Sequence, residues 1–366
     1  MDKLLSQKFR FFTFLSIILV VFIHCYNLQN RYLQPFTIVE EPLTVTTFVE
    51  YWVCNGLVRF IIPLLFIISG FLFASGDEQS YKFRILKRLR TLLFPYLIWS
   101  AITLILTYWF QQFPASSQVL KDARLDQLGD NRPYSQFAWS DLLLRWTLFP
   151  NAFQLWFLRC LFVYNLAYPL LLKALTYYPK IWFSIVSFLW IASFGAHFME
   201  GEGLLFFSLG IYSQKGPLNI KKTTTLLQPK RWIGVYLVAS ILKTFLAFYF
   251  KWDLTSFIIL SIFHKTTVLS GLIVVWFSLD RLIIICMRRP WFVSLCSYSF
   301  FIYAIHVPFV CYAICYLYRY YPFLLHHRLL LFCLHPIATI LTALLIGKGF
   351  KLISPKLYAL FTGGRG

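Results

Sequence analysis

One histidine lies inside a long apolar run near the start of the chain. The run covers 9–27, FRFFTFLSIILVVFIHCYN, and its imidazole is that of His24. Histidine gains and loses a proton near neutral pH, so it can act as a general base or carry a group as a nucleophile. A titratable side chain inside a membrane is costly unless something pairs with it, which favours a functional role. A hydrogen-bonded structural histidine near the interface is the alternative.

Three further cationic or titratable residues fall at a similar depth in other apolar runs. Arg59 and Arg159 each lie about seven residues into a run, and His306 lies in the outer half of another. A helix rises about 1.5 Å per residue, so seven residues correspond to a depth of about 10 Å. Arginine stays charged and needs a polar or anionic partner in a membrane. Apart from Asp280, the last residue of one run, no Asp or Glu lies within the runs, so we expect both arginines to face an anion, a carbonyl or an oxyanion. Extension to the outer headgroups is the alternative.

The composition is that of a membrane protein. Hydrophobic residues make up 59% of the 366 residues and charged residues only 13%, whereas soluble domains average about 45–50% and about 25%. The net charge of +20 lies mainly in short connections between apolar runs, which indicates contact with lipid headgroups rather than nucleic acid. The eight cysteines show no disulfide or zinc spacing.

The runs predict a single all-α integral-membrane domain over 1–366, with no appended soluble domain. Most Lys and Arg fall in segments on the same side of the membrane as the N-terminus, which predicts that both termini are cytoplasmic. The first run is not followed by a small-residue cleavage site, which predicts an uncleaved anchor. Two long segments, 28–51 and 111–151, would then lie outside, where they could cover a cleft or serve as connectors. We expect ten membrane spans: 9–27, 52–75, 91–110, 152–172, 181–196, 203–213, 232–250, 256–280, 291–318 and 329–347.

Small and basic residues follow one another at the inner end of the second span. Ser69 and Gly70 would permit close approach of a ligand or of another helix. The basic cluster after them could bind phosphates from the cytoplasm, or simply anchor the chain at the inner surface. Its members are Lys82, Arg84, Lys87, Arg88 and Arg90.

Other polar residues in the runs are harder to place. Lys243, His264 and Lys265 could line the same interior or mark misplaced span boundaries. The later histidines and the carboxylates show no spacing that requires a metal, and no hydrolase motif is present. We therefore expect no metal cofactor.

Five stretches, in order along nearly the whole chain, resemble the membrane acyltransferase family 3. They are VVFIHCYN at the end of the first span, Arg59 before a proline and FIISGFLF, the basic cluster leading into LLFPYLIW, LWFLRCLFVY at 155–164, and SYSFFIYAIHVPF at 297–309. The resemblance implies a ten-helix core in the bacterial inner membrane. It also implies transfer of an acyl group, commonly acetyl, from cytoplasmic acyl-CoA to a hydroxyl of an extracytoplasmic carbohydrate.

One position departs from the family pattern. The family commonly carries an arginine eleven residues before the histidine, and here that position is Thr13. Arg10 lies one helical turn nearer the cytoplasm and could substitute in part.

On this hypothesis each site residue has an expected role in O-acyl transfer. His24 would deprotonate the acceptor hydroxyl or carry the acyl group, while Arg59 and Arg159 would stabilise the oxyanion. The basic cluster and Arg10 would hold the phosphates of coenzyme A, and Ser69 and Gly70 would let its pantetheine arm pass. Asn27 and His306 would contact the acceptor.

Two other classes of function stay open at this point. A transporter or flippase for an anionic or glycan substrate could use the arginines as its binding site, although the sequence shows no internal repeat. A non-catalytic membrane component of a polysaccharide export complex is the other.

Overall fold

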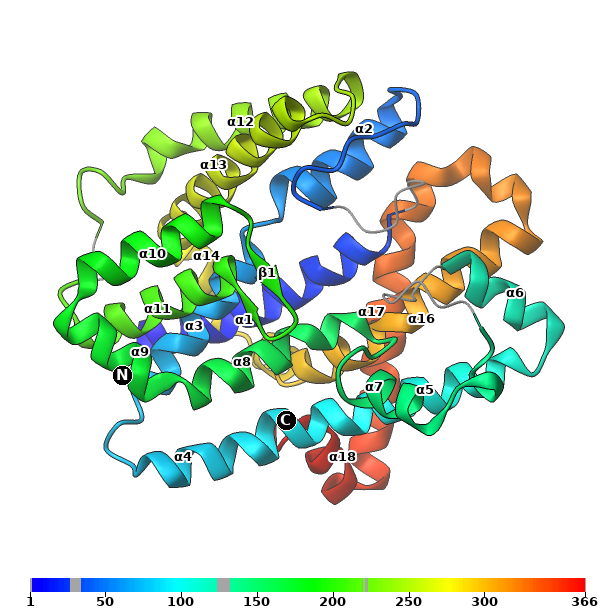
Figure 1. The fold of residues 1–366 in the computed structure, drawn as a ribbon, viewed down its shortest axis with the longest axis horizontal. Helices are drawn as coiled ribbons and strands as arrows, with labels where there is room; N and C mark the ends of the chain where they lie inside the picture. Colours follow the sequence, from blue (N-terminus) through cyan, green and yellow to red (C-terminus); the bar gives the residue numbers. More distant parts are fainter. Residues whose placement is uncertain (1, 27–33, 124–131, 219, 221–222, 366) are drawn as a thin grey trace. The chain divides into compact units, whose positions relative to one another are not determined.

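The structure is a computed structural model that describes residues 2–26, 34–123, 132–218, 220 and 223–365. Figure 1 shows an almost wholly helical chain, which confirms the predicted all-α class. Within the described residues the exception is a short antiparallel pair of strands, β1 (Gly195–Ala196) and β2 (Met199–Glu200). The chain forms two compact units, which are described separately below.

Unit 1 comprises residues 1–19, 28–86 and 163–296. Within it α12 and α13 lie side by side as an antiparallel pair (Figure 1). The helices that lie wholly or largely in this unit are α1 (Lys3–His24), α2 (Val45–Tyr51), the π-helix η1 (Trp52–Leu57), α3 (Ile61–Ala74), α4 (Tyr81–Arg88), α9 (Tyr168–Tyr177), α10 (Pro179–Ile191), α11 (Gly201–Lys215), α12 (Pro229–Tyr249), α13 (Leu254–Ser278), α14 (Asp280–Met287) and α15 (Pro290–Cys296).

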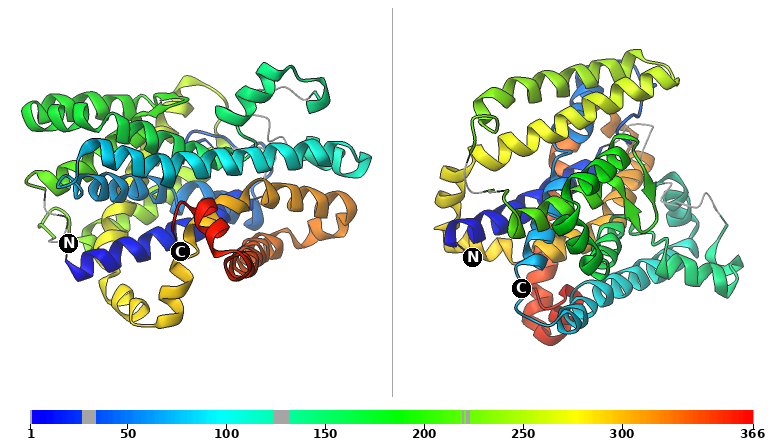
Figure 2. Two further views of the ribbon diagram at one scale, coloured as in Figure 1. Left: turned by 90° about the horizontal axis from the view of Figure 1, so that it is seen from below. Right: turned by 60° about the vertical axis from the view of Figure 1, so that its left-hand side comes forward.

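Unit 2 comprises residues 20–27, 87–162 and 297–366, and so includes the last turn of α1. Its helices α16 and α17 lie next to each other, and α18 folds back against α17 and α5 (Figure 2). The helices of this unit are η2 (Leu89–Leu93), α5 (Phe94–Gln111), α6 (Pro114–Ala123), η3 (Tyr134–Gln136), α7 (Trp139–Thr147), η4 (Phe153–Leu155), α8 (Trp156–Leu166), α16 (Ser299–Tyr320), η5 (Pro322–His327), α17 (Arg328–Ile353) and α18 (Pro355–Thr362).

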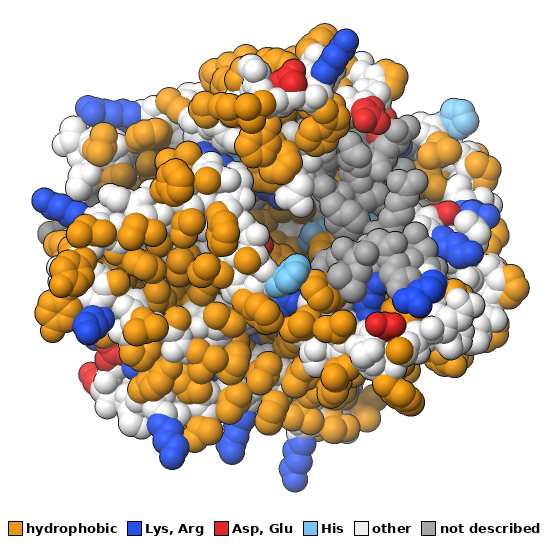
Figure 3. All heavy atoms as spheres, viewed as in Figure 1, with side chains coloured by type: hydrophobic (Ala, Val, Ile, Leu, Met, Phe, Trp, Pro, Cys, Tyr) orange, Lys and Arg blue, Asp and Glu red, His pale blue; other side chains and the backbone are white. Residues whose placement is uncertain are grey.

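Seven helical segments of the described chain are long and apolar enough to cross a membrane, and a bent pair, Phe153–Leu166 with Tyr168–Tyr177, could make an eighth. Exposed hydrophobic side chains cover much of the face over α9 and α10, as expected for contact with lipid (Figure 3). The protein is therefore a multi-pass helical membrane protein. The count of ten spans and the cytoplasmic termini stay predictions.

Several expected boundaries differ from the observed ones. The second span begins at Val45 rather than at residue 52, because α2 and η1 run into α3 as one apolar segment. The expected span 291–318 is divided into α15 and α16. The segment 111–151, which was expected to lie outside, carries the helices α6 and α7.

Helices α3 and α11 approach closely through glycines. A Cβ atom added at Gly70 would lie 2.2 Å from the Phe207 carbonyl oxygen, and one at Gly210 would lie 2.2 Å from the Ile67 carbonyl oxygen. Without side chains at these two positions the backbones can pack directly against each other. Gly70 therefore has a packing role, and the donor contact expected for Ser69 and Gly70 stays a prediction.

A network of ion pairs and a hydrogen bond lies at the connection between α3 and α4. The Asp77 carboxylate lies 2.6 Å from Arg84 Nη1 and 2.9 Å from Lys215 Nζ, and it accepts a 2.6 Å hydrogen bond from the Tyr168 hydroxyl. Partial burial opposes ionisation of Asp77, but the hydrogen bonds from Tyr168 and Lys215 and the nearby positive charges lower its pKa overall. Arg84 also donates to the Phe73 carbonyl oxygen at 3.0 Å. This arginine therefore stabilises the fold, whatever its role toward the donor.

Replacing Gly210 by alanine should destabilise unit 1, because the new methyl group would collide with the α3 backbone. Overpacking of this kind costs about 1–3 kcal/mol. The variant Gly234→Ala is a matched control, since a Cβ atom there meets nothing within 4 Å. Thermal unfolding in detergent micelles should show a lower midpoint for Gly210→Ala and an unchanged or higher one for Gly234→Ala.

Replacing Asp77 by asparagine should lower stability at neutral pH by about 1 kcal/mol, the order expected for a solvent-accessible ion pair. Because the pKa of Asp77 is lowered in the folded protein, its contribution is complete above the unfolded-state pKa of about 3.9 and is lost as the pH falls through the lower folded-state value. The difference between wild type and Asp77→Asn should therefore be constant from about pH 7 to pH 5 and shrink below about pH 4. A difference that is unchanged at about pH 2.5 would contradict this account.

Candidate active site

Two histidines and a phenylalanine meet in unit 2. His24 is the last residue of α1, His306 lies in α16, and Phe153 begins η4. The ring centroids of His24 and His306 are 5.4 Å apart with an interplanar angle of 26°. The Phe153 ring lies edge-on to His24 at 4.9 Å. The two histidines, for which the sequence predicted a similar depth, thus lie next to each other.

The backbone of α16 orients His306. Its Nδ1 atom lies 2.8 Å from the Tyr303 carbonyl oxygen and 3.2 Å from that of Ile302. A carbonyl oxygen can only accept a hydrogen bond, so Nδ1 carries the hydrogen and, in the neutral ring, Nε2 carries the lone pair. His306 is buried, and within the described part of the chain its Nε2 has no hydrogen-bond partner. This nitrogen can therefore accept a proton or a hydrogen bond from a ligand.

A break in α16 follows directly after His306. Val307 leaves the helical range of backbone angles (φ −108°, ψ 137°), and Pro308 has no N–H to donate to the carbonyl of Ala304, four residues earlier. The buried Gln154 amide replaces it, since Nε2 lies 3.2 Å from the Ala304 and Val307 carbonyl oxygens. The Tyr303 hydroxyl donates a 2.6 Å hydrogen bond to the main-chain carbonyl oxygen of Gln154. These bonds fix η4 against the segment that holds His306.

Arg159 lies in α8, six residues after Phe153. Its Nη1 atom donates to the Leu148 carbonyl oxygen, and the guanidinium also interacts with Tyr96. The carbonyl contact is one of the partners expected from the sequence. The side chain thus belongs to the same unit as the histidine pair, while a contact with substrate stays a prediction.

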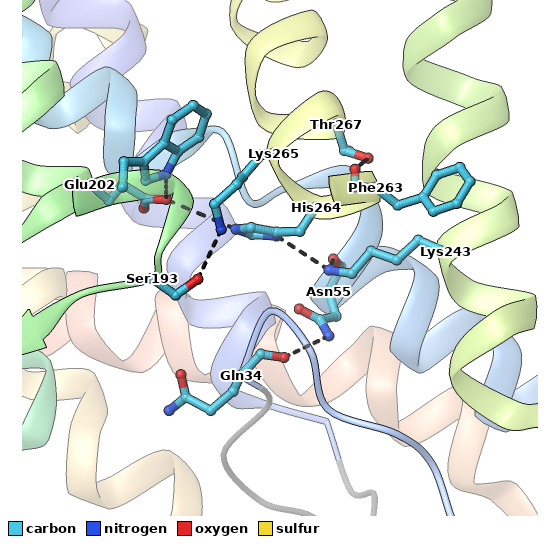
Figure 4. A network of polar contacts seen from close by, with 10 residues as sticks. Gln34, Asn55, Ser193, Glu202, Lys243, Phe263, His264, Lys265 and Thr267 are labelled. Carbon is cyan, nitrogen blue, oxygen red and sulfur yellow. Dashed lines mark hydrogen bonds and ion pairs between the residues drawn. The ribbon is translucent and has the colours of Figure 1, made fainter. Parts of the chain in front are cut away.

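A second polar cluster lies inside unit 1 (Figure 4). The fully buried Lys243 ammonium of α12 lies 2.7 Å from the Asn55 carbonyl oxygen and 3.2 Å from His264 Nδ1. His264 Nε2 lies 3.9 Å from a carboxylate oxygen of Glu202. Arg59 acts electrostatically on Lys243, His264 and Glu202. Lys243, His264, Lys265 and Arg59 thus act on one another or on Glu202 within unit 1.

The expectation that no carboxylate lies among the membrane helices is wrong. Glu202 is in the first turn of α11 beside His264, and Glu50 is fully buried in α2. Both had been assigned to connections because they lie just outside the most apolar stretches. Arg59 therefore has a carboxylate, Glu202, in its surroundings.

The residues expected to hold the donor lie in varied settings. Arg10 donates to the Val293 carbonyl oxygen at 2.9 Å, and Arg84 is engaged with Asp77. Three members of the basic cluster, Lys82, Lys87 and Arg90, are exposed, and Arg88 is half-buried. Asn27 lies outside the described residues. The expected roles of all these residues toward donor or acceptor stay predictions.

Two features of these sites were not predicted from the sequence. Gln154 received no role, although the proline directly after the His306–Val307 pair signals a helix break that needs a polar partner. Glu202 was excluded by its position at a span boundary. Within the described ranges, no group of three or more His, Cys, Asp and Glu residues could hold a metal ion.

Comparisons with known proteins identify the family of this chain. A family model described as an acyltransferase domain matches residues 12–348. The succinoglycan biosynthesis protein ExoH of Rhizobium meliloti (strain 1021) is 26% identical over 226 residues, which cover 60% of this chain and 57% of that protein. The chain thus matches less than two thirds of the length of that relative. No solved structure matches the chain. Because the family match covers nearly the whole chain, including His24, Arg59, Arg159 and His306, the protein belongs to acyltransferase family 3.

Proposed function

We propose that this protein is an integral-membrane O-acyltransferase that moves an acyl group, acetyl in the simplest case, from cytoplasmic acyl-CoA to a hydroxyl of an extracytoplasmic glycan. Family membership supports the reaction class. The name of the relative, a succinoglycan biosynthesis protein, supports a polysaccharide acceptor. The single observation that carries the proposal is the pair of imidazoles, His24 and His306, held side by side with one nitrogen available as a base.

The chemistry needs a base because a sugar hydroxyl has a pKa far too high to attack a thioester unaided. In the direct route the hydroxyl proton passes to an imidazole nitrogen as the oxygen bonds to the thioester carbonyl carbon. The carbon–sulfur bond then breaks, and the leaving thiolate takes the proton from the imidazolium. No net proton is gained or lost.

Two histidines can divide this work. His306 Nε2 is oriented as a proton acceptor by the Nδ1–H bond to Tyr303. His24 can serve as the base for the acceptor, or can carry the acyl group before the hydroxyl attacks. Close stacking disfavours a positive charge on both rings at once, so one ring remains available as a base.

The transition state also develops a negative charge on the carbonyl oxygen. Arg159, which lies in the same unit as the histidines, can supply charge-assisted hydrogen bonds to that oxygen, and Arg59 is the second candidate. Lys82, Lys87 and Arg90 are exposed and can meet the phosphates of coenzyme A.

The variant His24→Ala should fold and insert normally but lose acyl transfer, because the base or carrier is removed. The measurement is the transfer of label from acetyl-CoA to surface glycan in membranes, with the exposed His326→Ala as the matched control. Single-turnover labelling without acceptor separates the two roles, since only an acyl-histidine route leaves label on the wild-type protein. Full transfer by His24→Ala would refute the assignment.

The variant His306→Asn tests whether this ring acts as a base or only supports the fold. An asparagine amide can still donate to the Tyr303 carbonyl, but it offers no basic nitrogen. Loss of a general base lowers the rate by about 10²–10⁴-fold, so we expect kcat to fall by that order while thermal unfolding changes little. Wild-type turnover by His306→Asn would limit His306 to a structural role.

A further inference from the structure

The polar cluster of unit 1 is unusual in how its two lysines are held (Figure 4). Lys243 contacts a backbone carbonyl and a histidine nitrogen, and Lys265 Nζ donates to the Ser193 hydroxyl at 2.9 Å. All these partners are neutral or can be neutral. Among the described residues, neither lysine forms a salt bridge with a carboxylate.

The carboxylate nearest to the lysines is already engaged by other groups. Glu202 accepts a 3.1 Å hydrogen bond from Trp190 Nε1 and lies 3.9 Å from His264 Nε2. It acts on Lys265 only at longer range. Arg59, Lys265 and Lys243 all act electrostatically on this one carboxylate. Because Glu202 is shared among several basic groups, an anionic ligand group beside Lys265 would be favourable.

Two further observations point to a ligand at this place. Ser193, the partner of Lys265, has a φ of 54°, a conformation that residues other than glycine rarely adopt and that is often retained at functional sites. Ser261 lies one turn before Lys265 on the same face of α13, and its buried hydroxyl has no hydrogen-bond partner within the described residues. A ligand oxygen would satisfy both Ser261 and Lys265.

The position of the cluster along its helices favours the acceptor side. Lys243 lies six residues before the end of α12, Lys265 eleven residues after the start of α13, and the connection between these helices is short. The predicted topology places that connection outside. On that topology Lys243 lies in the outer third of α12 and Lys265 near the middle of α13, so the cluster lies between the centre and the outer end of this helix pair.

We propose that Lys265, Ser261 and Ser193, supported by Lys243 and His264, form a binding site for an anionic group of the glycan acceptor, either a carboxylate or a phosphate. Charge-assisted hydrogen bonds from Lys265 and a neutral hydrogen bond from Ser261 would hold its oxygens. The site would select acidic glycans over neutral ones. This inference rests on the proposed function, because it names the class of acceptor.

The test uses the full-length protein in lipid nanodiscs and three oligosaccharides of equal length, ending in glucuronate, in glucose 6-phosphate or in glucose. Acyl transfer gives KM and kcat, and the rise in unfolding temperature on ligand addition reports binding without turnover. A charge-assisted hydrogen bond corresponds to about tenfold in affinity or more. We expect KM for at least one charged oligosaccharide to be about tenfold below that for the neutral one. The oligosaccharide that shows the lower KM, glucuronate-ended or phosphate-ended, identifies whether the site binds a carboxylate or a phosphate.

Substitutions assign the preference to the cluster. Lys265→Gln should raise KM for the charged oligosaccharide about tenfold without changing kcat or the neutral KM, Lys265→Arg should keep most of the preference, and the exposed Lys251→Gln is the control. Ser261→Ala removes a hydroxyl that has no described partner, so it should weaken binding of the charged oligosaccharide a few-fold without loss of stability. Equal KM values for charged and neutral oligosaccharides in wild type, or equal losses for both in Lys265→Gln, would overturn the site. Charge-selective binding without any transfer would keep the site and refute the proposed reaction.

Discussion

Polar groups inside an apolar helical bundle must be matched by partners within the protein, and this requirement shapes both sites. Water is scarce there, so each unmet carbonyl, amide or charge costs several kcal/mol, of the order of a protein's whole stability. The Gln154 side-chain amide donates to main-chain carbonyls at the break in α16, and Lys243 Nζ donates to the main-chain carbonyl of Asn55. Each contact joins two helices that are distant in sequence. These polar residues therefore stabilise the packing of the helices in addition to forming the candidate sites.

Irregular helix geometry creates these opportunities. A regular α-helix uses all its internal carbonyls, whereas a proline or a π-helical turn leaves some available to side chains. Pro308 does this in α16 just after His306, and the π-helix η1 presents the Asn55 carbonyl to Lys243. Gly56 lets η1 approach α12 closely, since a Cβ atom there would lie 3.3 Å from the Ser240 carbonyl oxygen. The places where the helices are least regular are therefore the places where titratable side chains gather.

Hydropathy and depth predicted much of this arrangement and failed at identifiable points. The apolar runs revealed the helical membrane class, and the similar depth inferred for His24 and His306 is compatible with their observed stacking. Glu50 and Glu202 were missed because a carboxylate lowers local hydropathy, so a boundary drawn by hydropathy excludes the residue that a buried cation needs. The role of Gln154 could not be inferred either, because a partner brought by tertiary packing has no fixed spacing from the break that it satisfies.

The two sites differ in the kind of charge that they can accommodate. Acyl transfer from a thioester to a hydroxyl begins and ends with neutral groups at the reacting centre, and negative charge appears there only briefly. A pair of imidazoles beside Phe153, with Arg159 in the same unit, suits such a reaction, because neutral rings cost little to bury and become charged only during turnover. A lysine such as Lys265, whose close partner is the Ser193 hydroxyl, is instead stabilised in its charged form by an anion that stays bound. An acidic group on the acceptor would supply that anion and would leave the hydroxyl chemistry to the histidines.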